Sequence, residues 1–283
     1  MHRPGIFVLL LLLGVAYAAG WWRLSRRAWT RVAWWRPALT LAGLGSLALA
    51  LLSPLDALAH RRFVAHMAQH MLLIAVAAPA LLLADPLAAL LWALPAWARI
   101  RVGRLLVRGA PVRSVWRALT RMPVAWCAYA GVLWLWHVPW AYEWALGHRV
   151  AHDLEHLAFF AGAILFWWPV IGPAPRFGRA VHPGLRVVYL VTGALQSAAL
   201  GLSIAASPVV LYASYAAPPG PGGLAPLEDQ ALGGVVMWGG GGAVDMLAVL
   251  LLLHRFFSRL DPEPQRLPGT DGRGRRRDAA PLP

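Results

Sequence analysis

Residues 63–83 read FVAHMAQHMLLIAVAAPALLL, an apolar run that carries two histidines four positions apart. A run of this length spans the hydrocarbon core of a bilayer as one helix. The spacing of His66 and His70 places both imidazoles on one face of that helix, about one turn apart. Ionisable side chains within a spanning helix are costly and by default indicate a functional site. This stretch therefore predicts a membrane helix that carries polar chemistry.

The same apolar pattern recurs along the chain. Of its 283 residues, 59% are apolar and 13% are charged, whereas soluble domains carry roughly 25% charged residues. We therefore predict an all-α, polytopic membrane helical bundle with seven transmembrane helices. The apolar piece Pro86–Trp97 is too short to span, and we interpret it as a short interfacial helix that leads into an arginine-rich loop. The predicted spans are Ile6–Trp22, Pro37–Leu52, Phe63–Leu83, Met122–His137, Ala151–Ile171, Leu185–Ser207 and Leu232–Phe257.

The distribution of arginine predicts the orientation of this bundle. Cytoplasmic loops of membrane proteins carry an excess of Arg and Lys. With the amino terminus outside, only Arg3, Arg61, Arg62 and Arg149 of the 26 basic residues lie on the outer side. We therefore predict an N-out, C-in arrangement.

The charge and the two ends of the chain need separate interpretations. The formal charge of +14 indicates no nucleic-acid partner, because the arginines lie in short loops and no soluble stretch is long enough to fold as a nucleic-acid-binding domain. Residues 1–260 are predicted to form one transmembrane domain, and residues 261–283 a disordered cytoplasmic tail. The first run has a second interpretation as a signal peptide, because residues 16–18 (AYA) resemble a cleavage site.

Once oriented, the predicted spans bring histidines to one depth near the outer face. His66 and His70 come from the third span, and His152 and His156 from the fifth. His137 ends the fourth span on the same side. We interpret these five residues as candidate metal ligands, with a neutral hydrogen-bonded network between helices as the alternative. Two further candidates, which are otherwise solvated loop residues, are His60 and His148.

Carboxylates and thioethers accompany the histidines. Asp153 and Glu155 are candidates for the second shell, since a carboxylate commonly accepts the other ring N–H of a ligating imidazole. Glu155 has two alternatives, as a proton acceptor or as a partner of Arg149. Met67 and Met71 are possible ligands, and thioether with imidazole favours copper, as Cu(I), with zinc as the alternative. The single cysteine excludes a thiolate cage.

The seventh span combines small residues with a carboxylate. Gly239–Gly242 are four consecutive glycines, each of which weakens a helix by roughly 1 kcal/mol relative to Ala. We therefore predict a kink or an unwound turn there. Asp245 is costly within a span when charged, and we expect it to be protonated or bonded to the second or sixth span.

Four blocks of sequence carry a family resemblance. They are HMAQHMLL (66–73), LWHVP (135–139), HDLEH (152–156) with FWWP (166–169), and DQ (229–230) leading to GG (233–234) and MW (237–238). With these blocks the chain resembles the CtaG family of assembly factors for cytochrome c oxidase, the multi-span kind found with bacterial caa-type oxidases. The resemblance extends over most of the chain.

The resemblance implies a copper-binding assembly factor, or metallochaperone, rather than an enzyme. It would reside in the bacterial plasma (inner) membrane among membrane lipids and support copper insertion into the catalytic subunit of cytochrome c oxidase. A periplasmic copper carrier is a possible source of the metal. Copper would enter from the periplasmic side and pass on by ligand exchange.

Three other functions fit parts of the pattern. A membrane zinc-dependent hydrolase would use a metal-bound water with Glu155 or Asp153 as acid or base. A haem-binding cytochrome of the b type would use one histidine on each of two helices, such as His70 and His156. A copper permease would carry similar ligands, and transport across vesicles would distinguish it.

Overall fold

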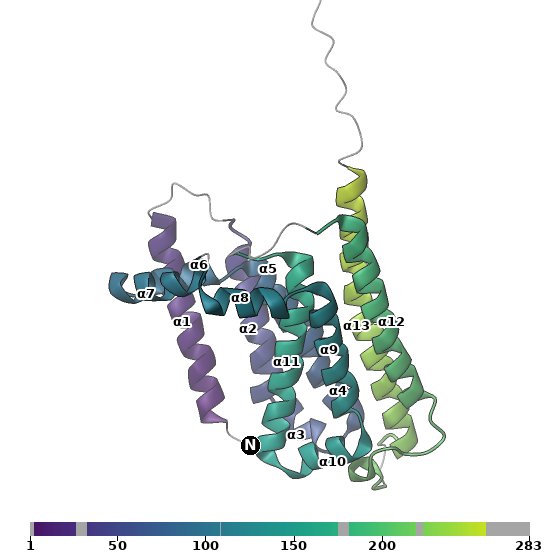
Figure 1. The fold of residues 1–283 in the computed structure, drawn as a ribbon. Helices are drawn as coiled ribbons and strands as arrows, with labels where there is room; N and C mark the ends of the chain where they lie inside the picture. Colours follow the sequence, from purple (N-terminus) through teal and green to yellow (C-terminus); the bar gives the residue numbers. More distant parts are fainter. Residues whose placement is uncertain (1–2, 27–32, 108, 175–180, 219–222, 259–283) are drawn as a thin grey trace, which may run out of the picture.

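The computed structural model describes residues 3–26, 33–107, 109–174, 181–218 and 223–258, and within them it contains helices and no strands. The predicted all-α class is therefore confirmed. Seven apolar helical segments run side by side (Figure 1) and coincide with the seven predicted spans. They are α1 (Pro4–Arg26), α2 (Arg36–Leu52), the continuous helix of α4 (Phe63–Met71), η1 (Leu72–Ala77) and α5 (Ala78–Ala84), α9 (Met122–Trp136), α11 (Arg149–Ile171), α12 (Pro183–Ala205) and α13 (Pro226–Phe257).

Five of these segments are long and apolar enough to cross a membrane, namely α1, α4 to α5, α11, α12 and α13. The helices α2 and α9 are shorter, with 17 and 15 residues. α2 ends two residues before Pro54, and α9 ends three residues before Pro139. The residue before a proline is disfavoured in α-helical geometry, and Ser53 and Val138 are indeed extended. The seven-span count therefore stays a prediction, as does the orientation.

The arginine-rich segment after the third span is helical, so the predicted loop is wrong. α6 (Leu87–Ala93), α7 (Ala96–Leu106) and α8 (Pro111–Leu119) lie across the bundle at one end (Figure 1). Pro95 is extended and separates α6 from α7. Arginine is a good helix former, which favours helix over loop in the segments that follow.

The predicted distortion of the seventh span is also wrong, because α13 is one regular α-helix. Glycine lowers helix propensity but removes no backbone hydrogen bond, so packing of α13 can outweigh its cost. The irregular segment is the π-helix η1 in the third span. Pro79 has no N–H for the Ala75 carbonyl and its ring crowds that carbonyl, which disturbs the regular pattern there. The Ser46 hydroxyl from α2 donates to the Leu72 carbonyl at 2.8 Å.

Short elements gather at the other end of the bundle, beside the amino terminus (Figure 1). They are α3 (Pro54–Ala59), α10 (Pro139–Gly147) and η2 (Ala213–Tyr215). Phe63 stacks on Tyr212 with ring centroids 5.1 Å apart, and Tyr142 packs on Tyr212 at 4.1 Å. These aromatic rings form a buried layer at the end of α4 where the first histidine pair lies. The predicted tail, residues 261–283, lies outside the described residues, so that prediction and the single-domain prediction remain untested.

Candidate metal centre

The first histidine pair is positioned by contacts between α4 and α13. The Asp229 carboxylate of α13 accepts hydrogen bonds from the backbone N–H groups of Phe63, at 2.7 Å, and Val64, at 3.3 Å. An N-cap from a distant helix thus fixes the start of α4. A Cβ on Gly233 would lie 2.2 Å from the Phe63 ring, so only glycine allows this approach. The face of α4 that carries His66 and His70 is thereby held in register.

Five predicted ligands converge in the interior of the bundle. Within each pair, His66–His70 and His152–His156, the ring centroids are 4.3 Å apart. Across α4 and α11, His66 lies 5.2 Å from His152 and His70 lies 5.5 Å from His156. His137, which follows the last residue of α9, lies 6.4 Å from His70. All five side chains are buried.

Glu155 joins these imidazoles, and the six residues together are called the histidine cluster below. Its side chain is fully buried, with one carboxylate oxygen 3.7 Å from His66 Nε2 and the other 3.8 Å from His70 Nε2. It therefore faces the cluster, and the alternative pairing with Arg149 is not observed, since Arg149 is exposed. Glu155 is placed as a potential ligand, closer to the imidazoles than its predicted second-shell position.

The cluster is rich in polar atoms that lack partners. Nine of its ring nitrogens and carboxylate oxygens are buried and make no hydrogen bond within the described part of the chain. An unsatisfied buried polar group costs about 1–3 kcal/mol, so this arrangement is expensive unless a ligand is bound. Two triads have ligand atoms within 4.8 Å of one another: His66, His70 and His156, and His66, His152 and Glu155. This donor set of imidazoles and one carboxylate fits copper or zinc.

Hydrogen bonds orient two of the imidazoles. His137 Nδ1 lies 2.7 Å from the Leu133 carbonyl, so it carries the proton and leaves the Nε2 lone pair free for a metal. His66 Nδ1 lies 2.8 Å from the Tyr142 hydroxyl and 2.9 Å from that of Tyr215. The Tyr215 hydroxyl donates to the Ala59 carbonyl, so its oxygen accepts from His66 Nδ1–H. His66 Nε2 then has the free lone pair and faces the cluster without a hydrogen-bond partner.

The phenols that hold His66 belong to the short elements of this end of the bundle. Burial raises the pKa of Tyr142 and of Tyr215, so both hydroxyls keep their protons. Sequence reasoning missed both residues. Nothing in the spacing of Tyr142 and Tyr215 indicates that α10 and η2 meet beside α4.

The remaining predicted ligands lie at the edge of the cluster or outside it. His60 is exposed, but its ring centroid is 5.0 Å from that of His152. His148 is exposed and packs on Trp144. Met67 and Met71 face α13, where Met67 packs near Gly233 and the Met71 sulfur lies 3.7 Å from the place that a Cβ would take on Gly241. Both side chains therefore contact α13, and these contacts add no support to their predicted role as ligands.

A family model described as cytochrome c oxidase caa3 assembly factor matches residues 15–259. The chain belongs to this family. The family resemblance predicted from the sequence is thereby confirmed, and the family description is consistent with a role in assembly of the oxidase. No curated protein and no solved structure matches the chain.

The region that matches the family contains the whole histidine cluster but not Arg3, for which no motif predicted a role at this site. The Arg3 side chain is buried, with Nη1 2.7 Å from Asp153 Oδ1 and Nη2 3.2 Å from Asp56 Oδ1. Its guanidinium also lies 3.4 Å from His152 Nδ1. Asp153 therefore pairs with Arg3 rather than with a histidine ring as predicted. Asp56 accepts a further hydrogen bond from Gln69 at 3.1 Å.

Proposed function

We propose that this family member carries copper, as Cu(I), in the histidine cluster and supports its insertion into the catalytic subunit of cytochrome c oxidase. The observation that supports this most strongly is the pair of overlapping triads that share His66. Copper is here the cargo of the protein. The family description supports the assembly role, and a donor set rich in imidazole is compatible with copper as well as with zinc.

The overlap of the triads suits transfer rather than storage. An ion held by His66, His152 and Glu155 can exchange ligands one at a time for His70 and His156 while His66 remains bound. A closed site that satisfied every ligand would retain the metal, whereas surplus donors leave an exchange position. His152 lies one helical turn before His156, so the triad that contains His152 and Glu155 is nearer the beginning of α11.

The membrane arrangement is part of this proposal. We propose that α2 and α9 also cross, which gives seven spans with the amino terminus outside in a bacterial plasma membrane. The cluster then lies near the periplasmic face, where a soluble copper carrier can supply the ion. The arginine distribution supports this orientation, and no catalytic step is required of the protein.

A double substitution tests the proposal. His66→Ala with His70→Ala removes two donors, and we expect copper affinity to fall at least about tenfold, since loss even of an outer-shell partner costs 10–100-fold. The measurements are copper per protein under reducing conditions and the copper content of the oxidase in cells. His148→Ala with His254→Ala, which changes two exposed histidines, is the matched control. Unchanged copper binding and oxidase maturation in the first variant would show that the proposal is wrong.

A membrane zinc hydrolase is the second candidate, because one triad contains a buried carboxylate beside two imidazoles. That donor set binds zinc in hydrolytic enzymes. Stable zinc binding with turnover of lipid amides would favour it over copper delivery. The haem alternative is less well supported, because the His70 and His156 rings are 5.5 Å apart and Phe159 packs 4.5 Å from His70, which does not fit a macrocycle between them.

A further inference from the structure

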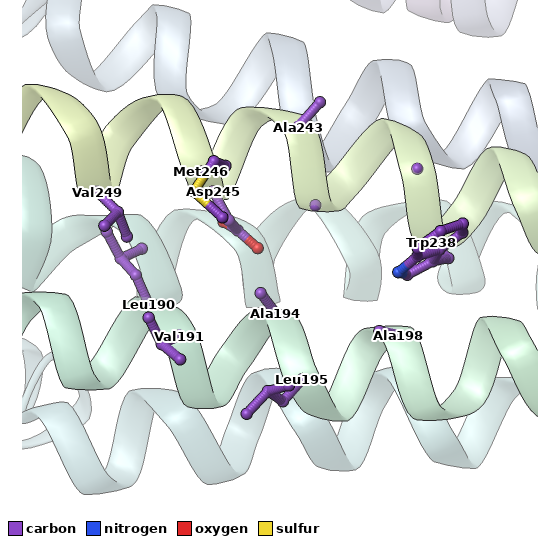
Figure 2. A pocket seen from close by; sticks show the side chains of 12 residues that line it. Leu190, Val191, Ala194, Leu195, Ala198, Trp238, Ala243, Asp245, Met246 and Val249 are labelled. Atoms are coloured by element: carbon purple, nitrogen blue, oxygen red, sulfur yellow. The ribbon is translucent and has the colours of Figure 1, made fainter.

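A groove of about 410 Å³ runs between α12 and α13 (Figure 2), and no residue of the histidine cluster lines it. These two helices form one edge of the bundle in Figure 1. Leu195 on the rim of the groove is 64% exposed and Trp238 is 44% exposed. The groove is therefore open on the side that would face lipid. The residues of its lining that matter below are Ala194, Ala198, Gly239, Gly242 and Asp245.

Contacts between α12 and α13 are tight on one side of this groove. A Cβ on Gly201 would lie 2.9 Å from the Gly234 carbonyl oxygen, and a Cβ on Gly234 would lie 2.5 Å from the Gly201 carbonyl oxygen. These two glycines are therefore required by the contact between the helices. They account for the close approach of α12 and α13 without any partner.

The glycines of the groove have no such explanation. A Cβ on Gly239 or on Gly242 would meet no atom within 4 Å. Each nevertheless weakens the helix by roughly 1 kcal/mol relative to Ala. The neighbouring Gly240 and Gly241 differ, since a Cβ on either would contact Met71. Close approach of another helix would use Gly239 and Gly242, because small residues let the backbones of membrane helices come together.

Asp245 adds a polar group to the same groove. Its carboxylate points toward Ala194 (Figure 2), which lies halfway along α12. Among the described residues, Asp245 makes no hydrogen bond and no ion pair; the phenols of Tyr129 and Tyr189 lie near enough for its charge to act on them, but the Tyr189 hydroxyl donates to the Phe166 carbonyl. An ionisable group at this depth of a spanning segment is expensive and is expected to have a partner. The groove therefore combines space, unused glycines and an acceptor without a donor.

We propose that this groove binds a membrane-spanning helix of another protein, one that presents a hydrogen-bond donor or a cationic side chain at the depth of Asp245. Asp245 is the only ionisable residue in the lining of the groove, and its carboxylate is complementary to such a donor. The exposed rim and the glycine floor provide the close contact. The proposal does not depend on the metal carried by the histidine cluster.

A second copy of the chain does not meet this requirement. In a symmetric dimer within one membrane the two-fold axis is normal to the membrane, so residues at equal depth face one another. The side chains of the groove near Asp245 are apolar, among them Leu190, Val191, Met246 and Val249. Asp245 would then face apolar groups or its own copy. An acyl chain would likewise leave the carboxylate without a donor.

Site-specific photocrosslinking in the native membrane tests the proposal. A benzoylphenylalanine at Leu195, on the rim of the groove, is compared with one at Leu157 of α11, which is 61% exposed. We expect the Leu195 probe to yield an adduct whose partner peptide is a membrane-spanning segment with a donor side chain. The Asp245→Leu change should lower that yield fivefold or more, which corresponds to about 1 kcal/mol for a hydrogen bond between membrane helices.

Variants of glycine provide the matched control for packing. Gly242→Leu fills the groove and should abolish the adduct, whereas Gly131→Leu on α9, where a Cβ also meets no atom within 4 Å, should leave it unchanged. Expression and thermal stability are measured for each, because these open positions allow folding. An adduct with a second copy, an adduct with lipid alone, no adduct, or one insensitive to Asp245→Leu would each overturn the proposal.

Discussion

The Nδ1 atom of His66 is held by two phenols, and this contact decides which nitrogen the residue offers to a metal. Outer-shell partners of this kind fix the tautomer and the ring orientation of a metal ligand. His137 is held in the same way by the Leu133 carbonyl. The candidate ligands at the centre of the cluster are thus oriented by residues outside it, as the proposed metal binding would require.

Removing those hydroxyls should weaken copper binding without unfolding the protein. We expect Tyr142→Phe with Tyr215→Phe to lower the affinity for Cu(I) about tenfold or more, because His66 Nδ1 loses both partners. Competition against a chromophoric Cu(I) chelator measures this affinity. Tyr189→Phe is the control, since its hydroxyl donates to the Phe166 carbonyl in another part of the core. Equal affinities in the two variants would exclude the orienting role of the phenols.

At the scale of helices, two kinds of glycine distinguish α13. Gly234 packs against the α12 backbone, whereas the glycines of the groove meet open space. Glycine is therefore required for helix packing at Gly234, whereas no contact within the chain requires it at Gly239 or Gly242. This difference separates contacts that hold the fold together from a surface available to a partner.

Adding a single methyl group at Gly234 tests whether the close contact of α12 and α13 contributes to the stability of the protein. Gly234→Ala places a Cβ 2.5 Å from the Gly201 carbonyl oxygen and should destabilise the protein by about 1–3 kcal/mol, the usual cost of overpacking. Gly131→Ala should be neutral or stabilising by up to about 1 kcal/mol. Thermal unfolding in detergent compares the two. A similar unfolding temperature for both variants would contradict the backbone contact.

Much of the element pattern was predictable, and the exceptions have physical reasons. The i, i+4 spacing of each histidine pair placed its two imidazoles on one helix face, and long apolar runs gave the helices. The π-helix before Pro79 and the continuous α-helix of α13 were not predicted. Helix propensity alone does not show whether a proline or a run of glycines distorts a helix, because packing against neighbouring helices also decides this. The contacts made by Arg3, Tyr142 and Asp229 were not predicted for a related reason. Each acts across an interface between segments distant in sequence.

For the whole molecule, the orientation is the prediction that most needs a measurement. In a Cys127→Ala background, a single cysteine at Arg61 or Ala217 should react with a membrane-impermeant maleimide from outside the cell. A cysteine at Arg104 should react only after permeabilisation. All three positions lie outside the seven apolar helices, so labelling reports the side of the membrane. If the cysteine that replaces Arg104 reacts in intact cells, the predicted orientation or the predicted number of crossings is wrong.

If α2 and α9 cross the membrane as proposed, their early ends have a consequence for the depth at which the proposed cargo is bound. At 1.5 Å per residue, the 15 residues of α9 extend about 22 Å, against a hydrocarbon thickness of about 30 Å. Lipid adapts to a short helix by thinning locally, which brings the headgroup layer closer to His137. A hydrated donor protein would then reach the imidazoles through a shallow, partly wet depression in the leaflet, without a pore through the bilayer.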